Sequence, residues 1–455
     1  MHNHQKKLIS VSVLTLSLCA GAGLASASAS EGEAARLGDD LTPMGSERAG
    51  NGDEIPEWDG GLTTPPDDYE GDHHYVNPFP EDEELYRIDQ SNVDEHRDRL
   101  SPGQVKMIET YDDYFIPVYE TRRTATVPES IQEQTQENAT TVELAPGGNG
   151  LQNYEDGTPF PIVDHPLHVI FNHITRYRGG AIEREVVQVT PQSDGDFSPV
   201  RFVEELVQPA HLSDYDPDDH DNILFYFKQT IESPSRLAGN TLLVHETIDQ
   251  VEEPRSAWLY NDGQRRVRRA PQVSYDGPGT AADGQRTSDN LDLYNGAPDR
   301  YDWELKGKKE MYIPYNSYDF ASQDLDYDDI IHAGHVNQEH ARYELHRVWH
   351  VRATLKEDER HVYEQRDFFV DEDSWQIAVV DHYDGRGDLW RVAEAHKIQA
   401  YDEDIPFYAF ETLYDTLSGR YLVMGLTNEQ TNAFDFDINR RSTEFTPSAL
   451  RRSGR

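Results

Sequence analysis

The stretch HVYEQRDFFVDEDSWQIAVVDHYDGRGDLWRVAEAHKIQA, residues 361–400, decides the fold of this chain. It holds three runs rich in aromatic and β-branched residues, 361–370, 375–383 and 389–400, which are typical of strands. The intervening segments, 371–374 and 384–387, have the length of hairpin loops. Because parallel neighbours need a crossover of a dozen or more residues, these runs are predicted to pair antiparallel as a meander.

Similar strand patterns continue on both sides of this stretch. We expect them at 183–190, 223–231, 241–248, 257–260, 343–352, 407–417 and 420–426. The fold class predicted is mainly β with short helices (α+β), built on a large, curved, open antiparallel sheet. Alternation on 375–383 places Trp375, Ile377, Val379 and Tyr383 on one face. Several strands are apolar on both sides, so both faces must be covered, and the concave face either packs on itself or encloses a ligand.

The first 29 residues are typical of a secretory signal peptide. Lys6 and Lys7 precede an apolar run over 8–18, and small residues follow with cleavage patterns that end at 27 and 29. We therefore expect a periplasmic protein, with an uncleaved anchor as the alternative. The sole cysteine, Cys19, follows Leu18 where lipidation normally needs a small residue, so a lipid anchor is not expected. Cleavage would leave a chain without disulfides or thiolate sites.

The remainder divides into two predicted regions. Residues 30–161 are rich in Pro, Gly, Asp and Glu, and we interpret them as an arm that packs on the main sheet. Short helices are predicted at 81–88 and from Ser101-Pro102, where serine caps and proline takes the first helical position. Residues 162–455 form the predicted half-barrel domain, which an acidic, turn-rich segment at 270–302 interrupts.

The charge of the chain is strongly one-sided. Asp and Glu number 85 against 41 Lys and Arg, which gives a formal net charge of -44. Such a surface disfavours nucleic acid and anionic membrane as partners. It is typical of proteins from salt-loving organisms, with an acidic protein of an ordinary organism as the alternative.

Motifs for common chemistries are missing. The sequence has no G-x-S-x-G, H-E-x-x-H, dinucleotide-binding or phosphate-binding glycine motif. Histidines crowd 332–350, but in a chain with 19 of them we predict no metal site and no cofactor. The prediction is a non-enzymatic protein. An enzyme acting on an envelope lipid or glycan remains an alternative, and it would use residues such as His346, His350, Asp381 and His382.

Large aromatic residues on the strands are candidates for the wall of a ligand cavity, although such residues more often belong to a core. The candidates are Trp258, Tyr260, Trp349, Trp375 and Trp390. Behind Trp258-Leu259-Tyr260 stands a basic run with arginines at 265, 266, 268 and 269. One interpretation is that these arginines pair with carboxylates and stabilise the sheet. The other is that one pair binds an anionic head group at the cavity mouth, and we take Arg266 and Arg268 as its candidates.

Two long stretches carry a family resemblance. LTPMGSERAGNGDEIPEWDGGL, residues 41–62, resembles the N-terminal signature of the bacterial domain-of-unknown-function family 1329, and residues 342–396 are similar to its C-terminal core. Members of that family look like relatives of periplasmic lipoprotein carriers and outer-membrane lipoprotein-sorting proteins. The sorting proteins pair a W-L-Y strand with a basic R-R-V-R-R strand, which residues 258–260 and 265–269 match. The resemblance implies a half-closed antiparallel barrel with helices in its mouth.

The same resemblance suggests a function. The family is associated with outer-membrane barrel proteins and with export or uptake systems for hydrophobic compounds. We therefore expect a periplasmic carrier or binding protein for a hydrophobic or amphipathic molecule, such as a lipid, fatty acid, alkane or sterol. Its expected partners are that molecule and possible barrel or transporter proteins of the envelope. An assembly factor that binds a barrel protein without a ligand is the alternative.

Overall fold

The predicted meander forms the centre of a 15-stranded sheet. The structure is a computed structural model, which describes residues 28–71, 74–217, 220, 222–270 and 275–453. The strands of the large sheet are β1 (Tyr86–Ile88), β2 (Ile116–Val118), β5 (Ala181–Val189), β6 (Val200–Val207), β7 (Ile223–Ser233), β8 (Thr241–Thr247), β9 (Ser256–Asn261), β10 (Arg266–Arg269), β11 (Tyr301–Pro314), β12 (Tyr343–Leu355), β13 (Gln365–Asp371), β14 (Ile377–Tyr383), β15 (Leu389–Ala400), β16 (Ile405–Asp415) and β17 (Tyr421–Leu426). A separate hairpin pairs β3 (Glu143–Leu144) with β4 (Leu151–Gln152).

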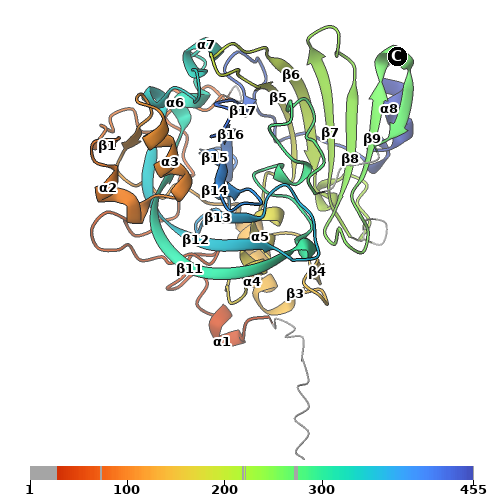
Figure 1. Cartoon of the computed structure of the whole chain (residues 1–455). Helices are drawn as coiled ribbons and strands as arrows, with labels where there is room; N and C mark the ends of the chain where they lie inside the picture. The colour runs from red at the N-terminus through yellow and green to blue at the C-terminus, as the bar shows by residue number, and fades with distance from the viewer. Residues whose placement is uncertain (1–27, 72–73, 218–219, 221, 271–274, 454–455) are drawn as a thin grey trace, which may run out of the picture.

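Two meanders make up the sheet. Strands β12 to β17 follow one another, β17 then pairs with β5, and β5 to β10 continue in order. The sheet is not closed, because its order runs from β1 at one end to β10 at the other. All the pairings between these strands are antiparallel except a short parallel contact between β2 and β12. In Figure 1, β5–β9 form the wall on the right and β11–β13 curve across the lower left. The predicted open antiparallel sheet is confirmed.

The helices are short. They are α1 (Glu31–Ala34), α2 (Val93–His96), α3 (Pro102–Thr110), α4 (Glu129–Thr141), α5 (Pro166–Thr175), α6 (Tyr318–Ala321), α7 (Tyr327–Ile330) and α8 (Pro447–Ser453). The predicted helix at Ser101 is α3, and Ser101 caps it in a capping box with Gln104. The helix predicted at 81–88 is wrong. Its end is β1, because Tyr86 pairs with Val118 and Ile88 with Ile116 in a sheet that overrides local helical preference.

The face assignment on β14 needs a correction. A bulge interrupts β14, since Phe369 pairs with Val379 while Val370 pairs with Ile377. Val379 therefore does not share a face with Ile377, and Val380 takes its place in the cluster that contains Trp375.

The sheet has two faces, the α3 face and the α5 face, each called after the helix that packs on it. The α3 face carries Asp381 and Glu394, which bind α3: Gly103 N and Ser101 Oγ each donate to Asp381 at 3.0 Å. The α5 face carries Val380 and Ala393, which share a cluster with Val169, Ile170 and Ile174 of α5. Its buried apolar residues on the central strands are Val351, Phe368, Val370, Ile377, Val380, Ala393, Ala395, Leu413 and Leu422.

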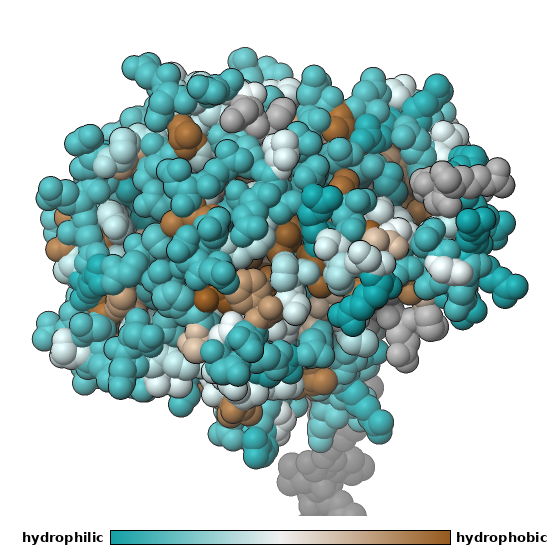
Figure 2. Space-filling view, turned by 90° about the horizontal axis from the view of Figure 1, so that it is seen from above, coloured by the Kyte–Doolittle hydropathy of each residue, from teal (hydrophilic) through white to brown (hydrophobic). Residues whose placement is uncertain are grey.

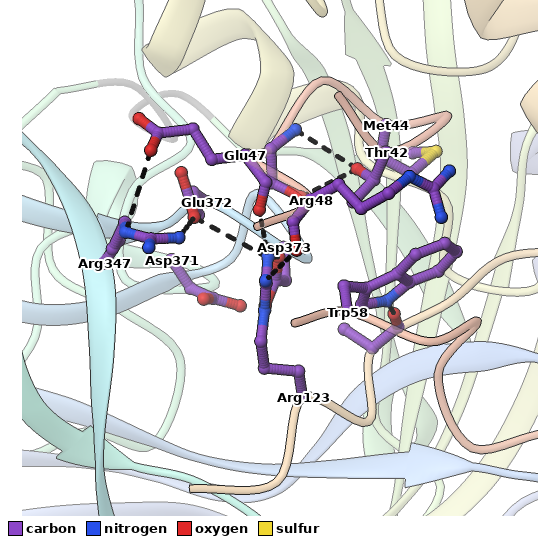
Figure 3. A network of polar contacts seen from close by, with 12 residues as sticks. Thr42, Met44, Glu47, Arg48, Trp58, Arg123, Arg347, Asp371, Glu372 and Asp373 are labelled. Carbon is purple, nitrogen blue, oxygen red and sulfur yellow. Dashed lines mark hydrogen bonds and ion pairs between the residues drawn. The ribbon is translucent and has the colours of Figure 1, made fainter. Parts of the chain in front are cut away.

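A buried ion-pair network joins the two stretches that carry the family resemblance. Arg123 donates to both carboxylate oxygens of Asp373, in the β13–β14 turn, at 2.9 and 2.7 Å. Its remaining NH groups donate to the backbone oxygens of Glu47 and Arg48 at 2.8 and 3.0 Å, as Figure 3 shows. Burial would raise the pKa of Asp373, but Arg123 outweighs it and lowers the pKa to about 2. The network fastens the arm to the sheet.

Candidate ligand-binding site

Along the meander of β5–β10, the α5 face of the sheet borders a cavity. Its wall comes from alternate residues of three neighbouring strands: β7 contributes Phe225 and Phe227, β8 contributes Leu242 and Val244, and β9 contributes Leu259. Register places them together, because Phe227 pairs with Val244 and Leu242 with Leu259. The strand pattern thus produces one apolar wall.

A loop segment over residues 277–295, the roof, lies opposite this wall. Its residues Pro278, Gly279, Thr280, Arg286, Ser288 and Leu291 line the same cavity, which holds about 310 Å³. A smaller chamber of about 40 Å³ adjoins it through Phe225, Phe227 and Leu291. The larger volume lies at the lower end of the roughly 300–1,000 Å³ that ligand pockets occupy.

Buried ion pairs hold the roof to the sheet. Asp289 accepts from Arg366 Nη1 at 2.9 Å and contacts His361 at 3.1 Å. Asp292 pairs with Arg176 and Arg178, which follow α5. Burial would raise the pKa of Asp292, but the two arginines lower it well below its usual range. The roof is therefore a fixed part of the cavity.

The mouth of the cavity lies beside the edge of the sheet. Leu259 is 44 % exposed, an unusual position for a leucine in a lining wall. On the edge strand β10, Arg268 stands opposite Leu259. The surface seen from above is mostly hydrophilic, with hydrophobic residues gathered near the middle of the view (Figure 2).

The predicted aromatic residues lie elsewhere. Trp258 and Tyr260 point to the opposite face and pack in the cluster that includes Phe445 and Leu450 near the C-terminus. Trp375 is 0 % exposed and donates its indole NH to the Met44 carbonyl at 2.9 Å.

Two further candidates also lie outside the cavity lining. Trp349 packs against the cluster that contains Trp375, with the Lys308 ammonium 4.8 Å from its ring centroid. Trp390 donates to Asp415 at 3.0 Å. Neither belongs to the residues that line either chamber.

The four arginines at 265–269 do not pair with carboxylates within the part of the chain that the structure describes. Arg268 contacts Gln264 and Arg269 contacts Ser256, each at 3.0 Å, while Arg266 is exposed. No ion pair among the described residues therefore supports the interpretation that they stabilise the sheet; the four arginine side chains are exposed, while Val267 between them packs on the cluster of Tyr260. Charges on an edge strand such as β10 discourage pairing with another chain.

The residues of the alternative enzyme do not converge. Asp381 binds α3, whereas His382 lies 2.8 Å from Asn290 of the roof, on the other face. His346 and His350 each contact their own carboxylate, Glu344 at 3.0 Å and Asp367 at 2.9 Å.

One group of metal-ligand geometry occurs among the described residues: His346, Asp371 and Asp373. The Lys397 ammonium binds Asp371, and it also donates to Ser374 at 2.6 Å. Arg123 neutralises Asp373. Cations of the chain itself therefore match these carboxylates, which makes the group a structural network rather than an open metal site.

Sequence reasoning missed the residues that build the cavity. Phe225 and Phe227 stood out only as members of a strand with apolar groups on both sides. Arg286 lies in a segment that reads as an acidic, turn-rich interruption. The register of β7 against β8, which brings the wall together, was the missing information.

The comparisons with known proteins identify a family. Residues 87–451 match the family described as "Protein of unknown function (DUF1329)". An uncharacterized protein of Pseudomonas aeruginosa is 58% identical over 424 residues, which are 93% of this chain and 93% of that protein. The chain belongs to the DUF1329 family. The predicted family membership is thus confirmed.

Solved structures of low sequence identity are also similar in part. A putative outer membrane lipoprotein-sorting protein domain from Vibrio parahaemolyticus is 13% identical with a TM-score of 0.41, covering 60% of this chain and 92% of that one. A DUF1329 family protein from Desulfovibrio piger is 15% identical with a TM-score of 0.40, covering 60% and 91%. A LolA superfamily protein from Nitrosomonas europaea is 13% identical with a TM-score of 0.34, covering 60% and 92%.

Proposed function

We propose that this protein is a periplasmic carrier or binding protein for a hydrophobic or amphipathic molecule, working with an outer-membrane or export/uptake system. The observation that carries the proposal is the cavity between the apolar wall of β7–β9 and the roof. Elsewhere the α5 face is filled by the chain's own side chains. The lining combines apolar walls with a few polar groups, as is usual for small-molecule sites.

The mouth of the cavity supports the same function. An exposed leucine at 259 and the arginines at 266 and 268 would meet an amphipathic ligand as it enters. A non-enzymatic role fits the dispersed positions of His346, His350, Asp381 and His382. No helix in the described ranges combines the length and hydrophobicity that crossing a membrane requires. Residues 1–27 of the predicted signal peptide, Cys19 among them, lie outside the described residues.

Extraction of the purified protein tests the proposal. The chain without residues 1–29 is expressed in a lipid-rich host, purified in molar salt, and its organic-solvent extract is analysed by mass spectrometry against a mock purification. We expect one hydrophobic species in near-stoichiometric amount. An empty extract, repeated after incubation with alkanes, fatty acids and sterols, would overturn the carrier function. Copurification of a barrel protein without any lipid would support the assembly factor instead.

Two exposed leucines provide a matched control. Leu259 lines the cavity at 44 % exposure, and Leu417, which is 63 % exposed, lies on the β16–β17 hairpin. Because both are exposed, neither substitution removes a core contact. Leu259→Asp is expected to lower the amount of bound ligand several-fold, while Leu417→Asp leaves it unchanged.

A further inference from the structure

We propose that Arg286 binds the anionic head group of the ligand, so that the cavity takes an apolar molecule with one acidic group, a carboxylate or a phosphate. This inference rests on the proposed carrier function and specifies its ligand class. It follows from the position of Arg286, from the pairing of the charges around it, and from the shape of the apolar wall.

Arg286 is buried but unpartnered. It lies in the roof, lines the larger chamber and is only 8 % exposed. Its Nε has no hydrogen-bond partner, and its guanidinium forms no ion pair with any residue in the described ranges. A Cβ at Gly279 would lie 2.8 Å from this Nε, so the glycine lets the guanidinium rest against the backbone. A buried charge without a partner is costly, and a ligand anion would remove that cost.

The carboxylates that line the two chambers already have their own arginine partners. Glu204 pairs with Arg184 at 2.8 Å. Glu246 pairs with Arg255 at 2.6 Å. Asp292 pairs with Arg178. Among the arginines that line the two chambers, Arg286 is the one without a carboxylate partner in the described ranges.

A fourth acid near Arg286 does not change this balance. Glu411 on β16 attracts Arg286 across the interior, together with Glu204. Burial, reinforced by Asp292, raises the pKa of the Glu411 carboxyl, and Glu411 makes no ion pair with Arg286 among the described residues. Four arginines and three carboxylates line the two chambers, an excess of positive charge inside a chain with a net charge of -44.

The chemistry of the site fits an acidic amphiphile. A guanidinium presents parallel NH donors that match the two oxygens of a carboxylate or phosphate. Phe225, Phe227, Leu242 and Val244 offer an apolar surface beside it for the ligand's body. A hydrocarbon without a head group would leave Arg286 unpaired.

Binding of three probes with the same chain tests the inference. Radiolabelled hexadecanoic acid, hexadecyl phosphate and hexadecan-1-ol are titrated onto the delipidated protein, in the wild type and in Arg286→Gln and Arg286→Lys. We expect the acid or the phosphate to bind more tightly than the alcohol. Arg286→Gln should weaken binding of the preferred anion by about 10- to 100-fold and of the alcohol by less than about 3-fold, since a charge-assisted hydrogen bond is lost. Arg286→Lys should retain part of the preference.

The controls separate this inference from the proposed function. Arg386→Gln, on the exposed β14–β15 hairpin, should not change binding of any probe. Arg286→Gln should keep or raise the melting temperature, because it removes an unpaired buried charge. If wild type binds the alcohol as tightly as the anions, or if Arg286→Gln weakens all three equally, Arg286 does not read the head group although the carrier function stands. If no probe binds, the carrier function fails first.

Discussion

One face of one sheet behaves differently in its two meanders. In the filled half, the α5 face of β12–β15, residues such as Phe368, Val380 and Ala393 are fully buried in a cluster that also contains residues of α5, the arm and the roof. In the cavity half, the α5 face of β6–β9, Leu242 and Leu259 keep part of their surface exposed beneath the roof. The strands have the same apolar alternation in both halves. The roof lies over parts of both halves, so how closely the covering segments pack on the face decides whether it becomes core or binding site.

The largest expected effect comes from opening the filled half. Trp375→Ala removes a completely buried ring and its hydrogen bond to the Met44 carbonyl, and it should lower the free energy of unfolding by about 3–5 kcal/mol. Urea titration followed by circular dichroism measures this loss. A loss of less than about 1 kcal/mol in the free energy of unfolding would contradict the comparison.

A pH effect of similar size is expected on the α3 face behind the filled half. Burial raises the pKa of Glu394 to about 7, although Tyr343, Gln104 and Tyr114 donate hydrogen bonds to it. The folded state holds this proton more tightly than the unfolded state. The stabilisation that Glu394 contributes is therefore fully present below about pH 4.5, and it is lost as the pH rises to about 7. The fall due to Glu394 is on the order of 3 kcal/mol.

Glu394→Gln isolates that contribution, since the amide cannot ionise. Unfolding free energies are measured from pH 4.5 to 8 in both proteins, and the variant should lose less stability over this range. Asp381, whose pKa burial also raises to about 7, still contributes a slope in the variant, reduced because the Glu394 charge no longer adds to its shift. Parallel curves for variant and wild type would show that Glu394 does not carry the proton.

In the cavity half the same kind of truncation should cost much less. Leu242 is half-buried and only partly packed on its neighbours, because it also borders the cavity, so Leu242→Ala should lower the free energy of unfolding by about 1 kcal/mol. The free energy of ligand binding, measured with the hexadecyl probes, should fall by more than the free energy of unfolding does. A loss of about 3 kcal/mol would mean that this wall is packed like the filled half.

The smallest effect is expected at the mouth. The double substitution of Arg266→Gln and Arg268→Gln should slow association of an anionic probe about 2- to 5-fold at low salt, and molar salt should abolish the difference by screening. Stopped-flow fluorescence with an anionic probe measures the rate. Equal rates at low salt would show that these arginines do not assist entry of the ligand. The role proposed for Arg286 does not depend on that result.

The sequence predicted the sheet far better than the site. Short loops at 371–374 and 384–387 required antiparallel neighbours, and the capping residues at Ser101 positioned α3. Among the longer strands, β6 and β11 were missed; six of the 14 residues of β11 are charged, and Gly307 lies at a bulge. The bulge on β14 and the positive φ of 59° at Trp375 defeated simple alternation, since both depend on tertiary packing.

The sequence failed to predict the residues of the site for a similar reason. Large aromatic residues were taken as candidate cavity walls, but bulky rings are also what a sheet buries most readily, and Trp375 is an example. The cavity wall instead uses medium-sized residues at matching register positions. Arg286 became notable only because its neighbours already have partners, which no sequence pattern records.

Photolabelling tests most directly the claim that ligand enters the cavity half and not the filled half. Hexadecanoic acid carrying a diazirine in mid-chain is bound to the delipidated protein, irradiated, and the labelled peptides are mapped by mass spectrometry. We predict saturable labelling within 223–247 and 277–291, which unlabelled hexadecanoic acid suppresses. Labelling that is spread over the surface, or concentrated on β12–β15, would contradict the account.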